Sequence, residues 1–483
     1  MNKYYIHIEA FNMDAFIQDT NDLSTIRGSG LLLLDIIDEI SKNFKMLKPV
    51  STGASKGLFS FEARQNNDAK EIVNKIKGFL ADPPNDDFKG LRYATFLVDY
   101  VPAEAEFQKD KEILQTFVRW EQYKNPTIVV PEINAAKNVL PCHENRMLPG
   151  IRKDKKKNET VYVSESVKLR RQYGRKAKHT FYQKQLEKNG FQLEAEFVKE
   201  FEELTKGKNI LANKMAVIYA DGNRFSTIQQ DCCKTQDDYI KFDEQIKNYR
   251  AEALKNLIDR MLSDPSYQNN GKLRLETLLW GGDEFIWVVP AWKGFETLKL
   301  FYEVSENWCY QTEELKHAAG IVFCNYKAPI HAIRKLCEVI AEAAKETNRK
   351  KNLFQYLVLE SFDHIGQSLE NYRKKQFPVP DAQLSLDGNG IATLENFFKR
   401  MKQHLSRRQV HEMAEIASHS EFSWDNYCQQ IERIQKTSSH EAQSIISDLE
   451  ASELLGQGAG KWIHIRELWD YIVPDETERM DHA

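Results

Sequence analysis

The sequence predicts an α+β protein in which two ferredoxin-like units are separated by a basic insertion and followed by a helical C-terminal domain. Three observations support this fold class. The first 130 residues alternate strand-like and helix-like patterns in one order, the same order returns after residue 210, and amphipathic helical patterns fill the end of the chain. We therefore expect four parts, at residues 1–130, 131–210, 211–384 and 385–483.

The first unit is predicted from the succession of apolar patterns near the N-terminus. Residues 3–9 alternate like a strand, a glycine-containing loop follows, and residues 31–44 have the apolar spacing of a helix. A hairpin is expected over 47–63, a second helix over 68–81 and a last strand over 91–101. This is the order of the split βαβ fold, whose antiparallel sheet carries its helices on one face.

The second unit repeats this order with longer elements. Its expected segments are a strand and turn over 214–225, a helix over 238–262, a hairpin over 276–290, a helix over 293–308, a strand over 317–325 and a helix over 329–346. Residues 393–405 and 439–455 are also amphipathic, with polar links between them. The C-terminal part is therefore expected to be helical.

The composition limits the class of protein. The 483 residues are 41% hydrophobic, enough for several cores, and the net charge of -4 gives no chain-wide attraction to nucleic acid or anionic lipid. The seven irregularly spaced cysteines are typical of reduced thiols. The N-terminus lacks a secretory pattern, and the longest apolar run, at 31–37, contains Asp35 and is too short to span a bilayer. We expect a cytoplasmic protein without membrane contact.

One basic stretch stands out between Arg146 and Lys184. It contains 13 Lys or Arg residues against three Asp or Glu residues. It also contains four aromatic side chains, Tyr162, Tyr173, Phe181 and Tyr182. Cations that neutralise phosphates and rings that stack on bases together suit RNA binding. A solvated insertion with no partner explains such a charge run equally well.

Three carboxylates are predicted to meet in the second unit. Asp221 ends its first strand, and Asp283 with Glu284 lies at the tip of its hairpin. These strands are neighbours in a ferredoxin-like sheet, so the three acids would repel one another unless a cation lay among them. Hard oxygen ligands suit Mg²⁺ or Mn²⁺, and a pair of such ions can bridge the phosphates of a nucleotide. Asp221, Asp283 and Glu284 are therefore the predicted metal ligands.

Glycines accompany these acids. Gly281 and Gly282 permit positive φ in a tight turn and allow a phosphate to approach the backbone, and Gly222 can act in the same way after Asp221. A plain polar turn explains Gly-Gly-Asp about equally well when the motif is taken alone. The surroundings favour a functional site, because apolar strands flank the hairpin and the upstream strand ends in Asp-Gly.

These motifs resemble two families. "GGDEF" at 281–285 matches the signature of diguanylate cyclases, and "YADGNRF" at 219–225 lies where they carry Asp-x-Asp-x-Phe. The longer tract at 318–346 is similar to the large polymerase-like subunit of type III CRISPR effector complexes, whose palm domains carry Gly-Gly-Asp-Asp. "TNDLSTIRGSGLLL" at 20–33 also resembles a segment of that subunit. The resemblance implies two palm domains, a middle insertion and a helical end over nearly the whole chain.

The resemblance also implies roles for individual residues. Asp221, Asp283 and Glu284 would bind the metals. Asn223, where a second acid is common, and Phe225, at the end of that motif, would contact the nucleotide. Lys345 and Arg349 would bind the nucleotide phosphates, although cations at a helix end are also common without a ligand. The first palm has "GASKG" at 53–57 and no acid at its hairpin tip. It would be catalytically silent, and either a scaffold only or a contact for nucleotide through Ser29 and the Gly28 backbone.

The function that the resemblance implies is synthesis of an oligonucleotide signal. A metal-dependent nucleotidyltransferase would join nucleoside triphosphates, with ATP as the expected substrate, into a cyclic or short linear product in antiviral defence. One alternative is a diguanylate cyclase that uses GTP. Another is a non-catalytic subunit of an effector complex that binds RNA, or its neighbouring subunits, through residues 146–184.

Overall fold

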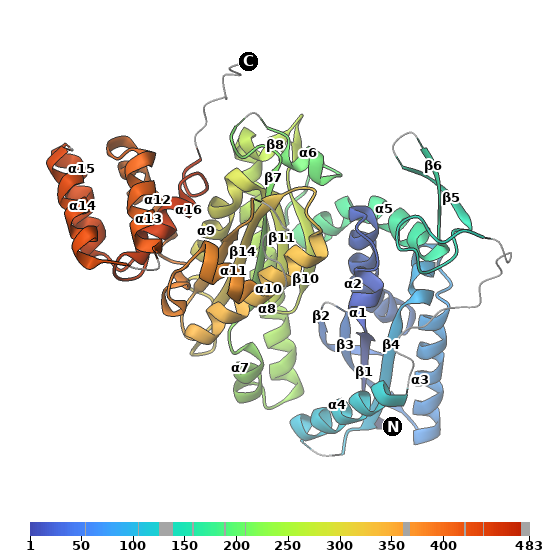
Figure 1. The fold of residues 1–483 in the computed structure, drawn as a ribbon. Coiled ribbons are helices and arrows are strands. Elements are labelled where there is room, and N and C mark those ends of the chain that lie inside the picture. The colour runs from blue at the N-terminus through green and yellow to red at the C-terminus, as the bar shows by residue number, and fades with distance from the viewer. Residues whose placement is uncertain are drawn as a thin grey trace.

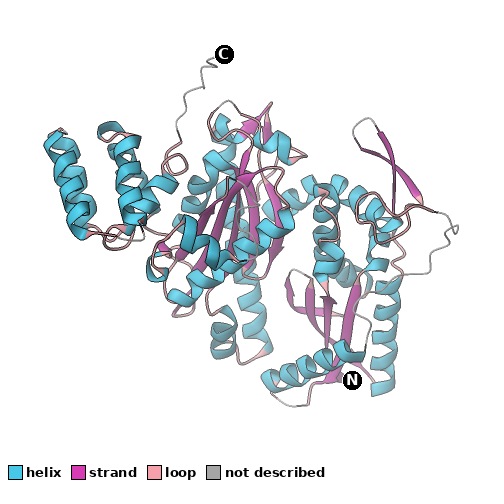
Figure 2. Cartoon of the chain, in the orientation of Figure 1, coloured by secondary structure: helices cyan, strands magenta, loops and turns pink. Residues whose placement is uncertain are grey.

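The computed structural model describes residues 1–474 except 54, 105, 125–138, 157–158, 188–189, 208, 361–367, 420–421 and 438. Two sheet-containing units lie side by side, and a helical region is attached to the second unit on the side away from the first (Figure 1). Colouring by secondary structure shows the two separate sheets, each packed against helices (Figure 2). The predicted α+β fold class is confirmed. Within the described ranges, no helix is long and apolar enough to cross a membrane.

The first unit is a four-stranded sheet with the order β2-β3-β1-β4. Its strands are antiparallel: β1 (Asn2–Phe11), β2 (Lys48–Gly53), β3 (Lys56–Ala63) and β4 (Thr95–Pro102). Its helices are α1 (Met13–Ile17), α2 (Leu23–Asn43), α3 (Asn66–Ala81), a 3₁₀ helix at Asp86–Tyr93, and α4 (Phe107–Lys124). Ile6 and Ile8 of β1 are buried in one apolar cluster with α2 and α3. The split βαβ order predicted for this unit is present.

Helix α2 begins eight residues earlier than the sequence suggests. Asp22 caps it, because its carboxylate accepts hydrogen bonds from the backbone N–H of Thr25 at 2.8 Å and from its hydroxyl at 2.6 Å. The expected glycine-containing loop at residues 28–30 is therefore wrong. These glycines lie inside the helix, where a second helix crosses it.

That second helix belongs to the insertion. The insertion contains β5 (Arg152–Lys156), β6 (Glu159–Val163), α5 (Glu165–Glu187) and α6 (Phe201–Thr205). At the crossing of α2 and α5, a Cβ atom on Gly28 would lie 1.8 Å from the backbone oxygen of Arg170. A Cβ on Gly174 would lie 2.0 Å from the backbone oxygen of Ser24. The two backbones therefore approach too closely for any side chain at these positions.

We expect Gly28→Ala to lower the free energy of unfolding by about 3 kcal/mol, because the added methyl forces the two backbones apart. Gly78→Ala in α3 is the matched control, since a Cβ there meets nothing within 4 Å. It should raise stability by about 0.5–1 kcal/mol through helix propensity. Urea unfolding of both variants provides the measurement, and equal stabilities would show that α2 and α5 can separate without cost.

The second unit has the six-stranded sheet β10-β11-β7-β14-β15-β16. Its main elements are β7 (Lys214–Gly222), α7 (Phe225–Cys232), α8 (Gln236–Ser263), β10 (Glu276–Gly281), β11 (Glu284–Pro290), α9 (Gly294–Ser305), β14 (His317–Asn325) and α10 (Ile330–Thr347). Short strands also occur: β8 (Gln268–Asn269), β9 (Lys272–Leu273), β12 (Cys309–Tyr310) and β13 (Glu313–Glu314). Strands β10, β11, β7 and β14 occupy the places of β2, β3, β1 and β4. The repeat predicted from the sequence is confirmed.

Two further strands extend this sheet. β15 (Leu353–Val358) pairs in parallel with β14 after the crossover helix α10, and β16 (Leu386–Asp387) pairs with β15. Gln355 interrupts the apolar run of β15, which hides the strand from a hydrophobicity pattern. β15 lies within the range expected for the second unit, whereas β16 lies just inside the range expected to be helical.

The remaining C-terminal elements are helices. They are α11 (Leu369–Gln376), α12 (Ile391–His404), α13 (Arg407–Ser418), α14 (Trp424–Thr437), α15 (His440–Ala451) and α16 (Gly460–Leu468).

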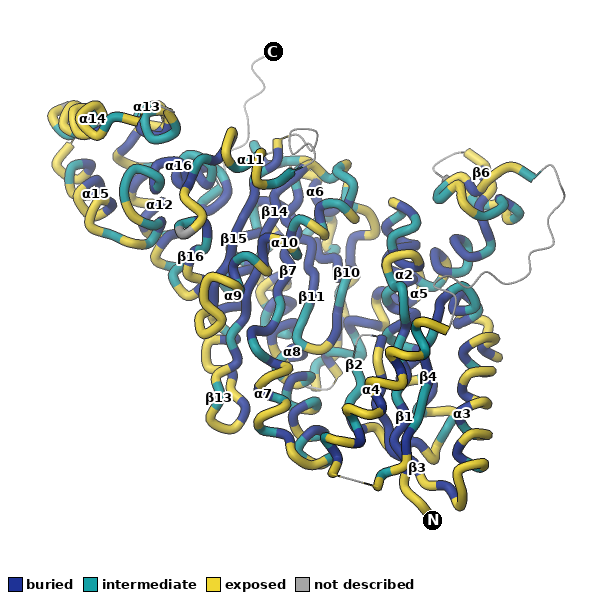
Figure 3. Tube along the Cα trace, turned by 60° about the horizontal axis from the view of Figure 1, so that its bottom comes forward, coloured by how far each residue is buried: buried dark blue, intermediate teal, exposed yellow. Residues whose placement is uncertain are grey.

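The two sheet units share part of their core, because Ile6 and Phe59 of the first belong to the same buried cluster as Val217 and Ile286 of the second. Figure 3 shows the central strands buried and the exposed positions concentrated on outer helices.

Candidate active site

The β10–β11 hairpin ends in a two-residue turn formed by Gly282 and Asp283. Gly281 and Glu284 pair directly across the strands below the turn. Gly282 has a φ of 46°, a conformation that glycine adopts without steric cost. The turn places Asp283 at the tip and Glu284 at the first position of β11.

Strand β7 brings Asp221 to the same end of the sheet. Phe285 of β11 lies opposite Ala220 of β7, so Glu284 and Asp221 are the next positions along and share the other face. Tyr219 also lies on that face, and its hydroxyl donates a hydrogen bond to Glu284 at 3.0 Å. The predicted carboxylates therefore come together at one sheet end, beside Tyr219, whose role no sequence pattern indicated.

The charges of these groups are coupled. Burial raises the pKa of Asp221, while Lys345 from the last turn of α10 opposes this by donating to its carboxylate at 2.6 Å. Burial and the charge of Asp221 raise the pKa of Asp283 to about 7. Burial also raises the pKa of Glu284, against the hydrogen bond from Tyr219. Holding all three carboxyl groups in the charged state therefore calls for a cation.

The donor chemistry fits the predicted metal. Carboxylate oxygens are the ligands that Mg²⁺ and Mn²⁺ prefer, and the pKa of Asp283 is raised first by burial and then by the negative charges of Asp221 and Glu284. Across the described residues, no three His, Cys, Asp or Glu side chains are arranged to hold a metal ion as they stand. In this arrangement Lys345 neutralises Asp221 instead.

The residues after Asp221 form a tight turn. A Cβ on Gly222 would lie 2.5 Å from the ring of Phe225, so glycine is required by packing. Phe225 is buried and its ring packs against Phe242 and His317. The expectation that Phe225 contacts a nucleotide is therefore corrected, because this side chain belongs to the core.

Asn223 faces a cavity lined with cations. Its Nδ2 donates to the backbone oxygen of Lys351 at 3.1 Å, and its buried Oδ1 has no hydrogen-bond partner among the described residues. The cavity is about 230 Å³, and its charged lining consists of Arg224, Lys316, Arg349, Lys350, Glu313 and Glu314. Arg349 was predicted from the sequence, whereas Lys316 and Lys350 come from segments without a motif. Arg224 follows "ADGN" directly, which is the signal that could have identified it.

The structure does not place Gly28 and Ser29 at a nucleotide site. Ser29 is buried, its hydroxyl donates to the backbone oxygen of Thr25 at 2.8 Å, and it accepts from Arg170 at 3.2 Å. Gly28 is covered by α5. The expected contact with nucleotide is therefore corrected, since α5 fills the space next to both residues.

The hairpin of the first unit meets the hairpin of the second. A Cβ on Gly53 would lie 3.3 Å from the backbone nitrogen of Gly282, so the two turns touch. Glu9 lies on β1 of the first unit and is held by Lys56 at 2.6 Å and His7 at 3.2 Å. These hydrogen bonds outweigh its burial and lower its pKa to about 2. Residue 54, in the middle of "GASKG", lies outside the described residues.

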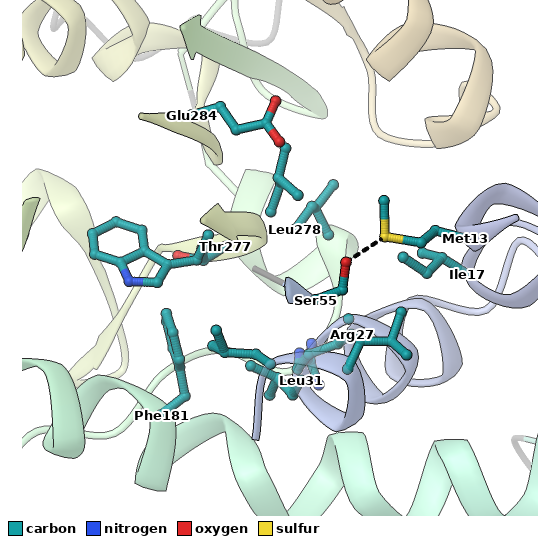
Figure 4. Close-up of a pocket in the computed structure, with 14 residues that line it drawn as sticks. Met13, Ile17, Arg27, Leu31, Ser55, Phe181, Thr277, Leu278 and Glu284 are labelled. Atoms are coloured by element: carbon teal, nitrogen blue, oxygen red, sulfur yellow. Dashed lines mark hydrogen bonds between the residues drawn. The ribbon is translucent and has the colours of Figure 1, made fainter. Parts of the chain in front are cut away.

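An apolar pocket lies between the two units beside Glu284 (Figure 4). Met13, Ile17 and Leu31 line one side from the first unit, and Leu278 lines the other from β10. The Ser55 hydroxyl donates to the Met13 sulfur at 2.9 Å within it. Its walls include Arg27 and Leu31 from the segment 20–33 and Glu284 from the segment 281–285, but neither pattern predicts an apolar pocket between two units.

A buried ion cluster ties both units to α5. Arg27 of α2 donates to both carboxylate oxygens of Glu276 at 2.6 Å, and Lys178 of α5 donates to Glu276 at 2.7 Å. Glu276 is the first residue of β10, the strand that leads to Asp283. The cluster therefore fixes the base of the hairpin strand against the first unit.

Much of the basic stretch is used inside the fold. Its internal ion pairs are Arg152 with Glu165, Arg170 with Asp19, Arg171 with Asp22, Glu144 and Asp154, Lys176 with Asp87, Lys178 with Glu276, and Lys184 with Asp35. Phe181 and Tyr182 are buried, and the Tyr173 hydroxyl donates to Asp35 at 2.6 Å. The expectation that these three rings stack on bases is corrected. Tyr162 remains exposed.

Comparison with known proteins defines the class of this site. Residues 214–354 match the family model for the second palm domain of Cas10/Cmr2. This range runs from β7 into β15 and includes Asp221, Asp283, Glu284 and Lys345. No curated protein sequence matches the chain.

Solved structures show the same fold over almost the whole chain. The Csm1–Csm4 cassette in complex with cA4 is 12% identical, with a TM-score of 0.59, and the match covers 98% of this chain and 70% of that one. Csm1 from T. onnurineus is 13% identical, with a TM-score of 0.57 and the same coverage. The resemblance to the large palm subunit of type III CRISPR complexes is thus confirmed, and the matched range is a palm domain of the Cas10/Cmr2 type.

Proposed function

We propose that the chain is a metal-dependent nucleotidyltransferase that joins ATP into a cyclic or short linear oligonucleotide. The observation that carries this proposal is the meeting of Asp221, Asp283 and Glu284 at one end of a palm-type sheet, where Lys345 donates a hydrogen bond to Asp221. Related Csm1–Csm4 cassettes have been solved with ATP, pppApA and cA3, which supports an adenine nucleotide as the substrate.

The residues have separate roles in this reaction. Asp221, Asp283 and Glu284 would bind Mg²⁺ or Mn²⁺, which supplies charge stabilisation at the phosphates when bound. Lys345 and Arg349 would bind the leaving phosphates, so Lys345 would exchange Asp221 for a phosphate. Gly282 is exposed at the tip and would let a nucleotide approach the backbone, whereas Gly281 is buried.

Each turnover would form one phosphodiester bond and release one pyrophosphate. A ribose hydroxyl oxygen attacks the α-phosphorus of ATP, the bond to the β-phosphate oxygen breaks, and pyrophosphate leaves. The hydroxyl proton passes to solvent water. Glu284, oriented by the Tyr219 hydroxyl, positions the attacking group.

The biological setting is also proposed by analogy. An oligonucleotide of this kind would serve as a signal in antiviral defence in the cytoplasm. Related chains occur in a cassette with Csm4, so a neighbouring effector subunit is the expected partner. RNA would bind through cations of the stretch 146–184 that the fold leaves exposed, such as Lys153 and Lys155.

The test incubates the purified full chain with each nucleoside triphosphate and Mg²⁺ or Mn²⁺, with and without single-stranded RNA. Mass spectrometry identifies the products, and a coupled assay measures pyrophosphate. We expect ATP to give oligoadenylates. Cyclic di-GMP from GTP would establish the diguanylate cyclase alternative, and salt-sensitive RNA binding without turnover would establish the non-catalytic subunit.

A further inference from the structure

Arg250 on α8 is a buried cation with unused hydrogen-bond donors. It is 8% exposed, and its Nε and Nη1 have no hydrogen-bond partner in the part of the chain that the structure describes. Its guanidinium lies 5.2 Å from the centroid of the Trp280 ring. Leaving such donors unpaired in a protein interior is costly, so a buried guanidinium normally faces an acceptor. These free N–H groups are what an anionic ligand would bind.

Arg250 and Lys345 lie on opposite sides of the β10–β11 hairpin. Trp280 pairs with Phe285 across the hairpin, and these rings occupy the face covered by α8. Lys345 pairs with Asp221 on the other face, which carries α10. Each face of the hairpin therefore has a cation near the tip, Arg250 on one and Lys345 on the other.

The charge of Arg250 is maintained in this environment. Burial lowers its pKa to about 10, while Asp243, Asp283 and Glu284 favour the protonated form. A pKa of about 10 still leaves the guanidinium protonated at neutral pH. The side chain is thus a permanent cation that none of these acids holds by a hydrogen bond within the described residues.

Arg250 lines a cavity of about 310 Å³ between the two units. The polar and charged lining consists of Lys247 and Arg250 from α8, Lys42 and Thr52 from the first unit, Lys184 and Gln185 from α5, and the acids Asp35, Asp38 and Glu187. Lys184 is paired with Asp35 and Lys247 with Asp243. Lys42 is exposed and lies 3.8 Å from Glu39. Arg250 is therefore the buried lining cation best placed to receive a new anion.

We propose that this cavity is an anion subsite in which Arg250 binds a phosphate group of a nucleotide, on the side of the hairpin away from Lys345. The planar guanidinium offers two parallel donors to phosphate oxygens, and Trp280 fixes its orientation. Thr52 and Gly53 bring the first unit into the same cavity. Which nucleotide carries the phosphate, an incoming triphosphate or the growing product, rests on the proposed function.

The test measures binding of inorganic tripolyphosphate to the full chain by calorimetry in EDTA, so that neither metal nor turnover is needed. Arg250→Met keeps the apolar stem against Trp280 but removes the donors, and we expect binding to weaken at least about tenfold. Arg250→Lys keeps the positive charge but not the planar pair of donors, so its affinity should lie between those of the parent and Arg250→Met. Lys255→Met removes a cation of α8 outside the cavity, where Lys255 pairs with Asp259, and should bind normally.

Two further arms sharpen the result. The same series in a Lys345→Met background removes a cation from the other face, and the effect of Arg250→Met should persist there. Binding of ATP, the incoming triphosphate, is compared with binding of a diadenylate that carries a 5′-triphosphate, which stands for the growing product. The ligand whose phosphate contacts Arg250 is expected to lose more affinity in Arg250→Met than the other ligand.

The outcomes decide the proposal. Unchanged affinity for all three ligands in Arg250→Met would overturn it, and a large fall in melting temperature with unchanged affinity would assign Arg250 to packing. Weakened phosphate binding in a chain that makes no oligonucleotide would support the subsite and reject the proposed function. The two proposals can therefore fail independently.

Discussion

Asp283→Asn is expected to reduce oligonucleotide synthesis at least about 100-fold while leaving the fold intact. The substitution keeps the shape of the side chain but removes the charge that a divalent cation needs at the hairpin tip. It also removes repulsion with Asp221, one cause of the raised pKa of Asp283. The melting temperature in metal-free buffer should therefore stay the same or rise, although oligonucleotide synthesis falls.

Asp259→Asn is the control for this prediction. It makes the same chemical change in the second unit, on a half-exposed position of α8 paired with Lys255. Synthesis should remain at the parental rate. Parental synthesis in Asp283→Asn would remove this residue from the active site, and a lowered melting temperature would show that the carboxylate supports the fold instead.

Glu276→Gln is expected to lower the free energy of unfolding by about 3–5 kcal/mol. Glu276 is buried and accepts hydrogen bonds from Arg27 and Lys178, so its neutralisation leaves two buried cations without a counter-charge. Chemical unfolding at neutral pH measures the loss. Asp448→Asn, which breaks an exposed pair with Arg400, should have little effect.

The same substitution should change the acid dependence of stability. Burial opposes ionisation of Glu276, but Arg27 and Lys178 prevail and lower its pKa below the ordinary 4.5. Its contribution is therefore complete above pH 4.5 and is lost as the pH falls through the lowered value. In Glu276→Gln, the free energy of unfolding should therefore fall less steeply as the pH is lowered below 4.5. The same slope in both proteins would contradict the stabilisation of the Glu276 carboxylate by Arg27 and Lys178.

The repeated fold could be predicted because its elements have strong local periodicity. Hairpins and amphipathic helices of both units show in the sequence, and Asp221, Asp283 and Glu284 fall at strand ends that the topology brings together. β15 was missed because a short run with Gln355 inside it does not show a clear period. Its position depends on the parallel partner β14.

Other errors arose from contacts between distant segments. Gly28 indicates a loop when only its neighbours are considered, whereas the structure uses it to let α5 cross at Gly174. Arg170 indicates a basic surface, yet its partner Asp19 is 151 positions away and makes it part of the interior. Arg250 lies in an ordinary amphipathic helix, so only the three-dimensional structure reveals its free donors.

The contact between the Gly53 and Gly282 turns has a kinetic consequence. Cyclases assembled from two identical chains lose their paired state on dilution, because the second palm must be recruited from solution. Here both palms belong to one polypeptide, and the tether holds the second turn at a high effective concentration. The specific activity of the proposed synthesis should therefore stay constant as the purified protein is diluted.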